Sequence, residues 1–385
     1  MTRFCAYLYV LLVFFIPCGL LVFFIPCGFG QGLTSSEQVR GELQRHQYDL
    51  SGSGRAFLSE EARKVSFFLL GELHGENEIP TLLRQLWPGM WQGGYRYIAA
   101  EVSPWAANQL EFSRAGQSKV VALWSKEEAL FVHSQGASQA VLWGCDMDEF
   151  QPELLIRDLS RANPSNVILG RMLGVTKAGY ERKMAPELLD LAHELTNIRD
   201  LAVDDASLVG NLRSTLEIES NRLKPETKFS AQVGRESLMK ELFLLHYREH
   251  IGSNSKAKVL ARFGRNHLHR GYDARGISTL GNLISEFAFS EHKTVFNVAA
   301  FGAGGKASFA GETWDADERG DDLAFDFLAS LARYPATVFD LRPIRPILHG
   351  IPEDKRNPVE QRLIYWADSY DAILCYKNVS PLQSN

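Results

Sequence analysis

The chain lacks the charge imbalance and the basic stripes that mark a nucleic-acid-binding protein. Among 385 residues, 41 Lys and Arg stand against 46 Asp and Glu, which gives a formal net charge of −5. No Lys/Arg stripe recurs along the chain, so nucleic acid is excluded as a partner. A small molecule is the substrate class that this composition favours.

Cysteine is scarce, and three of the five cysteines lie in the first 30 residues. Only Cys145 and Cys375 remain beyond that point, which is too few for a disulfide framework. Both lie in or beside apolar runs, so we expect buried free thiols. The chain also has no Gly-x-Ser-x-Gly elbow, no cysteine in a nucleophile context and no phosphate-binding glycine loop. These absences argue against a serine or cysteine hydrolase.

One long hydrophobic run occupies residues 4–29, after Arg3, and repeats a nonapeptide at 11–19 and 20–28. One copy alone would form the apolar centre of a secretory signal, whereas two copies exceed the roughly 20 residues that span a bilayer. We predict a signal peptide over residues 1–30, cleaved after Gly30, with an uncleaved membrane anchor as the alternative. In either case residues 31–385 form the exported domain, and a membrane is contacted only through this segment.

Beyond residue 64, apolar strand-like runs alternate with segments of helical periodicity. We expect strands at 65–70, 95–100, 140–143, 256–263, 294–301, 337–341 and 371–376. Such alternation predicts an α/β fold, a three-layer α/β/α sandwich with a mainly parallel sheet. Residues from about 150 to 250 show helical patterns only, which predicts a helical insertion that forms a cap over the site.

Charged side chains and histidines fall where the predicted strands end. Glu72 and His74 follow the first strand, Glu101 ends the second, Asp146 follows the third and His267 follows the fourth. The carboxyl ends of parallel strands meet at one sheet edge, where ligands bind in open α/β folds. We therefore expect one shared site, although each residue taken alone could be a helix cap or a structural histidine.

Hydrolysis is the chemistry that this set of residues supports. A neutral imidazole can take a proton from water, a carboxylate can orient it, and an arginine or second histidine can stabilise an oxyanion. We predict that His74 is the general base and that Glu72 and Glu101 support it rather than bind a metal. Because carboxylates raise the pKa of His74 and burial lowers it, we expect a value near neutrality.

Three interpretations that involve a metal stay open. The strand-end residues could bind a divalent cation as a metal-dependent hydrolase or protease would. Separately, His246-Tyr-Arg-Glu249-His250 matches the H-x-x-E-H zinc pattern, although cationic side chains are also favoured at a helix end. A haem-binding protein would need an axial ligand such as His267, His269 or His292.

Short motifs lie at the expected strand ends and in the helices between them. They are Leu-Gly-Glu-Leu-His-Gly at 70–75, Ala-Ala-Glu-Val-Ser at 99–103, Gly-x-Asp at 144–146, Arg-Glu-x-x-Met at 235–239, Gly-x-x-His at 264–267, Gly-Asn-Leu at 281–283 and Phe-Gly-Ala-Gly at 301–304. In their order and spacing these motifs resemble the erythromycin esterase family. The Gly-x-x-His turns are shared with TIKI-type membrane metalloproteases and ChaN-type haem-binding lipoproteins. The likeness to the TIKI-type proteases implies a divalent metal as an alternative, and the likeness to the ChaN-type lipoproteins implies haem or iron.

The resemblance implies water-mediated opening of an ester or lactone without a required metal. Carried over, His74 is the base, Glu72 and Glu101 hold and polarise it, and Arg235 and His267 complete the catalytic set. We further expect Asp146, Glu76 and Arg265 to contact a small-molecule ester or lactone substrate. The sequence thus predicts an exported carboxylic ester hydrolase with no cofactor.

Overall fold

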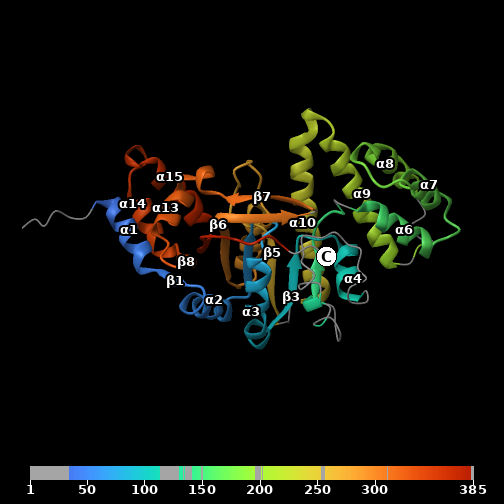
Figure 1. Ribbon diagram of the computed structural model, residues 1–385. Coiled ribbons are helices and arrows are strands. Elements are labelled where there is room, and N and C mark those ends of the chain that lie inside the picture. The colour runs from blue at the N-terminus through green and yellow to red at the C-terminus, as the bar shows by residue number, and fades with distance from the viewer. Residues whose placement is uncertain are drawn as a thin grey trace, which may run out of the picture.

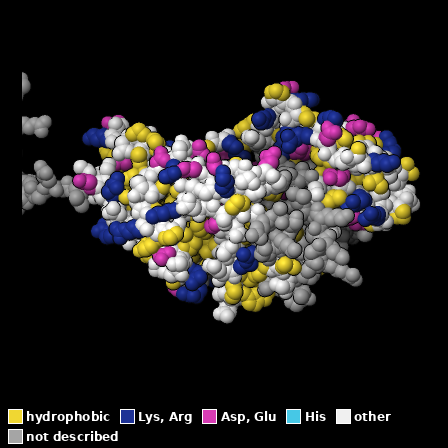
Figure 2. All heavy atoms as spheres, viewed as in Figure 1, with side chains coloured by type: hydrophobic (Ala, Val, Ile, Leu, Met, Phe, Trp, Pro, Cys, Tyr) yellow, Lys and Arg dark blue, Asp and Glu magenta, His cyan; other side chains and the backbone are white. Residues whose placement is uncertain are grey.

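The computed structural model describes residues 34–112, 130–132, 134, 141–148, 151–195, 201, 203–252, 256–309 and 311–382. The predicted signal peptide or anchor at 1–30 and much of an expected helical region at 105–134 lie outside these ranges. Within them, no helix has both the length and the apolar character needed to cross a membrane. On the face shown in Figure 2, cationic and anionic side chains are interspersed, without a patch of one sign.

The described strands form one mixed sheet in the order β1-β8-β9-β6-β2-β5-β3-β4, with β7 beside β6 (Figure 1). Strands β9, β6, β2, β5, β3 and β4 are parallel, whereas β8, β1 and β7 each pair antiparallel with a neighbour. Their bounds are Gln47–Asp49 (β1), Phe67–Glu72 (β2), Tyr95–Ala100 (β3), Leu142–Gly144 (β4), Lys258–Gly264 (β5), Val295–Phe309 (β6), Glu312–Asp317 (β7), Ala336–Asp340 (β8) and Ala372–Tyr376 (β9). The predicted α/β fold class is confirmed.

The central strand β2 is buried along its whole length and contributes side chains to two hydrophobic cores. Since successive side chains of a strand point to opposite faces, Phe68 and Leu70 pack with α2 and α3, and Phe67 and Leu69 pack with α10 and α12. The sandwich helices are α1 (Ser35–Arg45), α2 (Ser53–Lys64), α3 (Glu78–Gln92), α4 (Pro104–Phe112), α10 (Lys228–His250), α11 (Arg265–Leu268), α12 (Leu280–Ser290), α13 (Leu323–Leu331), α14 (Arg345–Gly350) and α15 (Pro358–Ser369).

The helical segment expected from 150 to 250 has two parts. Four helices gather beside the β4 end of the sheet as a lobe, seen at the right of Figure 1: α6 (Pro152–Ala162), α7 (Val167–Val175), α8 (Ala185–Glu194) and α9 (Val203–Arg222). By contrast, α10 packs on the sheet itself through Met239, Phe243 and Tyr247. Helix α10 therefore belongs to the sandwich and can deliver side chains to the sheet edge.

Several boundaries differ from the sequence prediction for local reasons. Strand β3 spans the predicted residues, but β2 begins at Phe67 because Val65 is the C-cap of the unpredicted helix α2. Strand β6 continues past the expected glycine turn to Phe309, where it forms a hairpin with the exposed, polar and unpredicted β7. Cys145 and Cys375 are buried and free, as predicted.

Candidate functional site at the carboxyl edge of the sheet

His74 lies in the turn that connects β2 to α3, with 33% of its side chain exposed. Gly75 follows with φ of 87°, a conformation that side chains other than glycine rarely adopt. The Gly75 carbonyl accepts hydrogen bonds from the N–H groups of Ser308 and Leu382, at 2.9 and 2.7 Å. The turn is thus fixed by β6 and by the C-terminal segment, and the imidazole is held in place.

Two buried carboxylates flank the imidazole. His74 Nδ1 lies 3.2 Å from Glu72 Oε1, and Nε2 lies 3.5 Å from Glu101 Oε2. Each carboxylate is fixed in turn: Arg262 Nε donates to Glu72 at 2.7 Å, and the Gly264 N–H donates to Glu101 Oε2 at 2.6 Å. Sequence reasoning missed Arg262, because an arginine inside an apolar strand gives no sign of its burial.

The electrostatics of His74 differ from the sequence prediction. Burial acts to lower the pKa of His74, but Glu101 and Glu72 outweigh it and raise the pKa to about 10. The expected value near neutrality is therefore wrong, because both ring nitrogens face a carboxylate. Burial alone would raise the pKa of Glu101, yet His74, His267 and Arg235 hold it well below its usual range. At neutral pH the pair is an imidazolium beside a carboxylate.

Helix α10 brings Arg235 to the far side of Glu101. Arg235 Nη2 donates to Glu101 Oε1 at 2.9 Å, and the same guanidinium binds both oxygens of Asp146, at 3.0 and 2.5 Å. Asp146 follows the end of β4, so this one arginine connects α10 to the ends of β3 and β4. The structure thus brings Arg235 and Asp146 into the group around His74.

His267 completes the group through an unpredicted partner, Glu236. His267 Nδ1 lies 2.6 Å from Glu236 Oε2, and Nε2 lies 3.6 Å from Glu101 Oε1. The other oxygen of Glu236 accepts the Leu280 N–H at 2.6 Å, which fixes the carboxylate at the start of α12. The sequence offered one indication that Glu236 belongs to the site, which is its position next to the predicted site residue Arg235. Two histidines therefore flank Glu101.

Charge balance limits what this group can bind. Three of the four buried carboxylates of the group, Glu72, Glu101 and Asp146, have cationic partners within it, namely Arg262, Arg235 and the His74 imidazolium. The fourth, Glu236, contacts His267. A divalent cation would have to displace these partners before it could use the same oxygens.

The structure does not bring Glu76 and Arg265 into this group. Arg265 Nη1 donates to Glu318 at 2.9 Å and to the Ala300 carbonyl at 3.0 Å, and its guanidinium lies over the Phe325 ring. Burial, and then Glu318, raises the pKa of Glu76 well above its usual range. The predicted contact of Arg265 with substrate is opposed by this packing, because its charge is already paired inside the fold.

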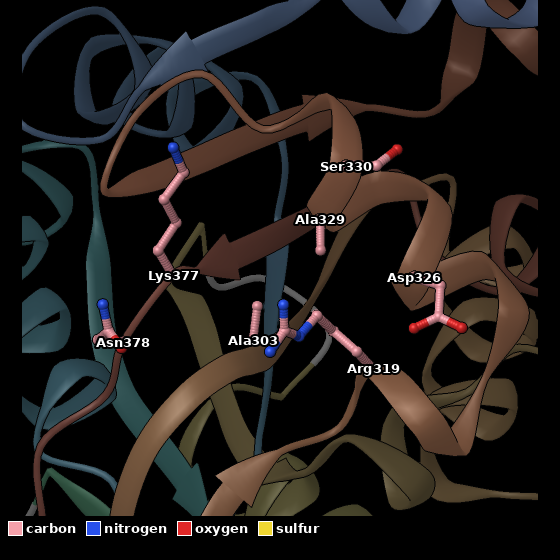
Figure 3. A pocket seen from close by; sticks show the side chains of 7 residues that line it. All are labelled: Ala303, Arg319, Asp326, Ala329, Ser330, Lys377 and Asn378. Carbon is pink, nitrogen blue, oxygen red and sulfur yellow. The ribbon is translucent and has the colours of Figure 1, made fainter.

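A separate hollow of about 560 Å³ opens beside Ala303 of β6 and just beyond the end of β9 (Figure 3). Ala303, Arg319, Asp326 and Lys377 contribute to its lining, and none of them is a predicted site residue. Arg319 is already paired with Asp317 at 2.5 Å. Because none of its lining residues belongs to the group around His74, the hollow is distinct from that group.

The remaining candidate histidines lie in three different environments. His269 is buried, with Nδ1 2.7 Å from the Arg270 carbonyl and Nε2 2.6 Å from Ser369 Oγ. His292 is exposed, at φ of 53°. His246 Nε2 lies 3.1 Å from the Gly144 carbonyl. Of the three histidines considered as haem ligands, only His292 is exposed, since His267 is also buried.

Comparison with known proteins rests on solved structures. No family model matches the chain, and no curated protein matches it significantly. A mutant of the erythromycin esterase EreC in its open conformation aligns with a TM-score of 0.59 and 13% identity, over 90% of this chain and 98% of that one. The chain shares the fold of an erythromycin esterase.

Two further structures share this fold at the same low identity. A protein from Bacillus cereus aligns with a TM-score of 0.61 and 13% identity, over 92% of this chain and 100% of that one. A succinoglycan biosynthesis protein aligns with a TM-score of 0.57 and 13% identity, over 91% and 99%. At this identity the likeness establishes the fold alone, and the activity has to be argued from the site residues.

Proposed function

We propose that the protein hydrolyses carboxylic esters or lactones with His74 as the general base. The observation that carries the proposal is the His74 side chain, partly exposed at the carboxyl edge of the sheet and held between two buried carboxylates. The esterase-like fold supports the same reaction class.

In the proposed reaction the two ring nitrogens of His74 have different roles. Nδ1 is within hydrogen-bonding distance of Glu72, so this carboxylate orients the ring and stabilises its charged form. Nε2 lies 3.5 Å from Glu101, too far for a strong hydrogen bond, and is the atom available to react. In the proposed reaction, Nε2 takes a proton from water as the water oxygen attacks the carbonyl carbon.

The tetrahedral intermediate then collapses with return of that proton. The oxyanion is stabilised by cationic or N–H donors, for which Arg235 and His267 on the other side of Glu101 are the candidates. The imidazolium of His74 gives its proton to the departing alkoxide, which leaves as an alcohol. For a lactone the alcohol stays attached, and the ring opens.

The raised pKa of His74 has a direct kinetic consequence. With a pKa of about 10, only about one molecule in 10³ carries a neutral imidazole at pH 7. The reaction therefore starts only from the small fraction of molecules whose ring has lost its proton to solvent, through the exposed part of the ring. The proposed enzyme works best at alkaline pH.

We also propose that the protein is exported through its N-terminal hydrophobic segment. Support comes from the uncharged run at residues 4–29 after Arg3. Cell fractionation followed by N-terminal sequencing of the product should give a chain that begins at Gln31. A chain that stays in the cytoplasm with residue 1 intact contradicts export without affecting the proposed chemistry.

The proposed activity is tested by incubating the purified protein with a panel of esters and lactones at pH 9. Release of acid should be proportional to enzyme concentration for at least one member, after subtraction of the uncatalysed rate. A His292→Asn variant serves as a matched control and should retain full activity, because His292 lies outside the group. Absence of turnover across the panel contradicts the proposal.

A further inference from the structure

Three potential metal ligands share the last turn of α10. His246, Glu249 and His250 each offer one ligand atom, and these atoms lie within 4.8 Å of one another. Their i, i+3 and i+4 spacing places them on one face of the helix. In the part of the chain that the structure describes, this is the one such set of three, and it lies apart from the group around His74.

One ring of this set already has the hydrogen bond that a metal-bound histidine makes. His246 Nε2 lies 3.1 Å from the Gly144 carbonyl, which can only accept a hydrogen bond, so Nε2 carries the proton. The lone pair is therefore on Nδ1, which is buried and has no hydrogen-bond partner. Metal-bound histidines characteristically donate their other ring N–H to a carbonyl or carboxylate in this way.

Aromatic packing restricts both histidine rings. Trp143 stacks on His246 at 11° and 5.7 Å, and on His250 at 26° and 5.8 Å. The two imidazoles lie nearly parallel, at 15°, with their centroids 5.8 Å apart. Two imidazoles that share a tetrahedral zinc, with Zn–N bonds of about 2.1 Å, have centroids roughly 5 Å apart. The centroid distance is thus within about 1 Å of that in a zinc site. The nearly parallel rings would also have to turn for both lone pairs to point at one ion.

We propose that His246, Glu249 and His250 bind a divalent transition metal ion, with zinc as the best match. Two imidazoles and one carboxylate form a donor set that zinc prefers, with the fourth position left for water. Glu249 is exposed and can move to close the coordination sphere. His250 is exposed but stacks on Trp143, so it binds the ion only after its ring turns out of that stack.

The proposed ion is structural rather than part of the ester hydrolysis. His246 lies eleven residues beyond Arg235, roughly 16 Å along the helix at 1.5 Å per residue. A bound ion fixes the His246 ring that contacts the Gly144 carbonyl at the end of β4. The ion therefore stabilises the packing of α10 against β4.

The test is a calorimetric titration of the full chain with zinc alone. The protein is first purified in the presence of a chelator, which is then removed. The wild type should bind one zinc ion saturably and gain thermal stability. His250→Gln and Glu249→Gln, both at exposed positions, should each weaken binding, His250→Gln by about tenfold or more. His193→Gln is the matched control, because His193 is an exposed helical histidine outside the set. Circular dichroism establishes that each variant is folded.

Three results overturn the proposal. The first is no saturable zinc binding by the wild type, and the second is unchanged affinity in both His250→Gln and Glu249→Gln. The third is loss of zinc binding in His74→Asn with retention in His250→Gln, because that result places the ion at the sheet edge. None of these measurements needs an ester substrate, so the outcome is independent of the proposed hydrolysis.

Discussion

Replacement of Glu101 by Gln tests the electrostatics of the site most sharply. The change removes one negative charge 3.5 Å from His74 Nε2 and keeps the shape of the side chain. The Gln carbonyl can still accept the Gly264 N–H that now donates to Glu101 at 2.6 Å. An adjacent opposite charge typically shifts a pKa by about 1–3 units. The pKa of His74 should therefore fall from about 10 to roughly 7–9 in this variant.

Two measurements report this shift. Titration of the His74 imidazole signal by NMR gives the pKa directly in each protein. In the wild type the logarithm of kcat/KM should also rise by one for each pH unit and level off near pH 10, because only the neutral imidazole accepts a proton. In Glu101→Gln the plateau should begin about 1–3 units lower.

The control is Asp368→Asn, which removes an exposed carboxylate that pairs with His349 at 2.8 Å. It should leave the titration of His74 unchanged. A wild-type pKa of His74 near 6.5, or an equal pKa in the wild type and Glu101→Gln, refutes the reasoning about this pair.

Three other predictions concern the site and its frame. In Gly264→Ala, the added Cβ would lie 2.8 Å from His74 Nε2 and 3.2 Å from Glu101 Oε2. The variant should therefore keep its fold but lose about a hundredfold or more in kcat/KM. Unchanged kinetics contradicts the proposed geometry. Glu111→Ala should destabilise the protein by about 2–3 kcal/mol in urea unfolding, because two buried N–H groups at β4 lose their shared acceptor; an unchanged midpoint excludes this anchoring role. Prolonged treatment with EDTA or phenanthroline should leave ester turnover intact, whereas loss of activity that added metal restores would favour the metal-dependent alternative.

The position of the site could be predicted because it depends on local pattern. The apolar runs before Glu72 and Glu101 form buried parallel strands, and such strands end at a common edge. That geometry alone brings Glu72, His74, Glu101, Asp146 and His267 together. Arg235 entered through the family resemblance, and the structure shows that the sandwich helix α10 delivers it.

The electrostatic partners could not be predicted, because they come from distant parts of the chain. Arg265 follows β5 beside the other candidates, yet it pairs with Glu318, 53 residues further on. Glu72 is balanced by Arg262, 190 residues away, whose charge is buried within β5. The pKa of His74 depends on the positions of both carboxylates, so an estimate from sequence neighbours gave the wrong value.

The central claim, that His74 is the general base of an ester hydrolase, is tested most directly by kcat/KM of His74→Asn. Once a substrate has been found, the variant and the wild type are compared with it at pH 9. Loss of a positioned base typically costs about 10²- to 10⁴-fold, so the variant should lose at least a hundredfold while its circular dichroism and melting transition show a folded protein. A folded His74→Asn variant with wild-type turnover would contradict the account.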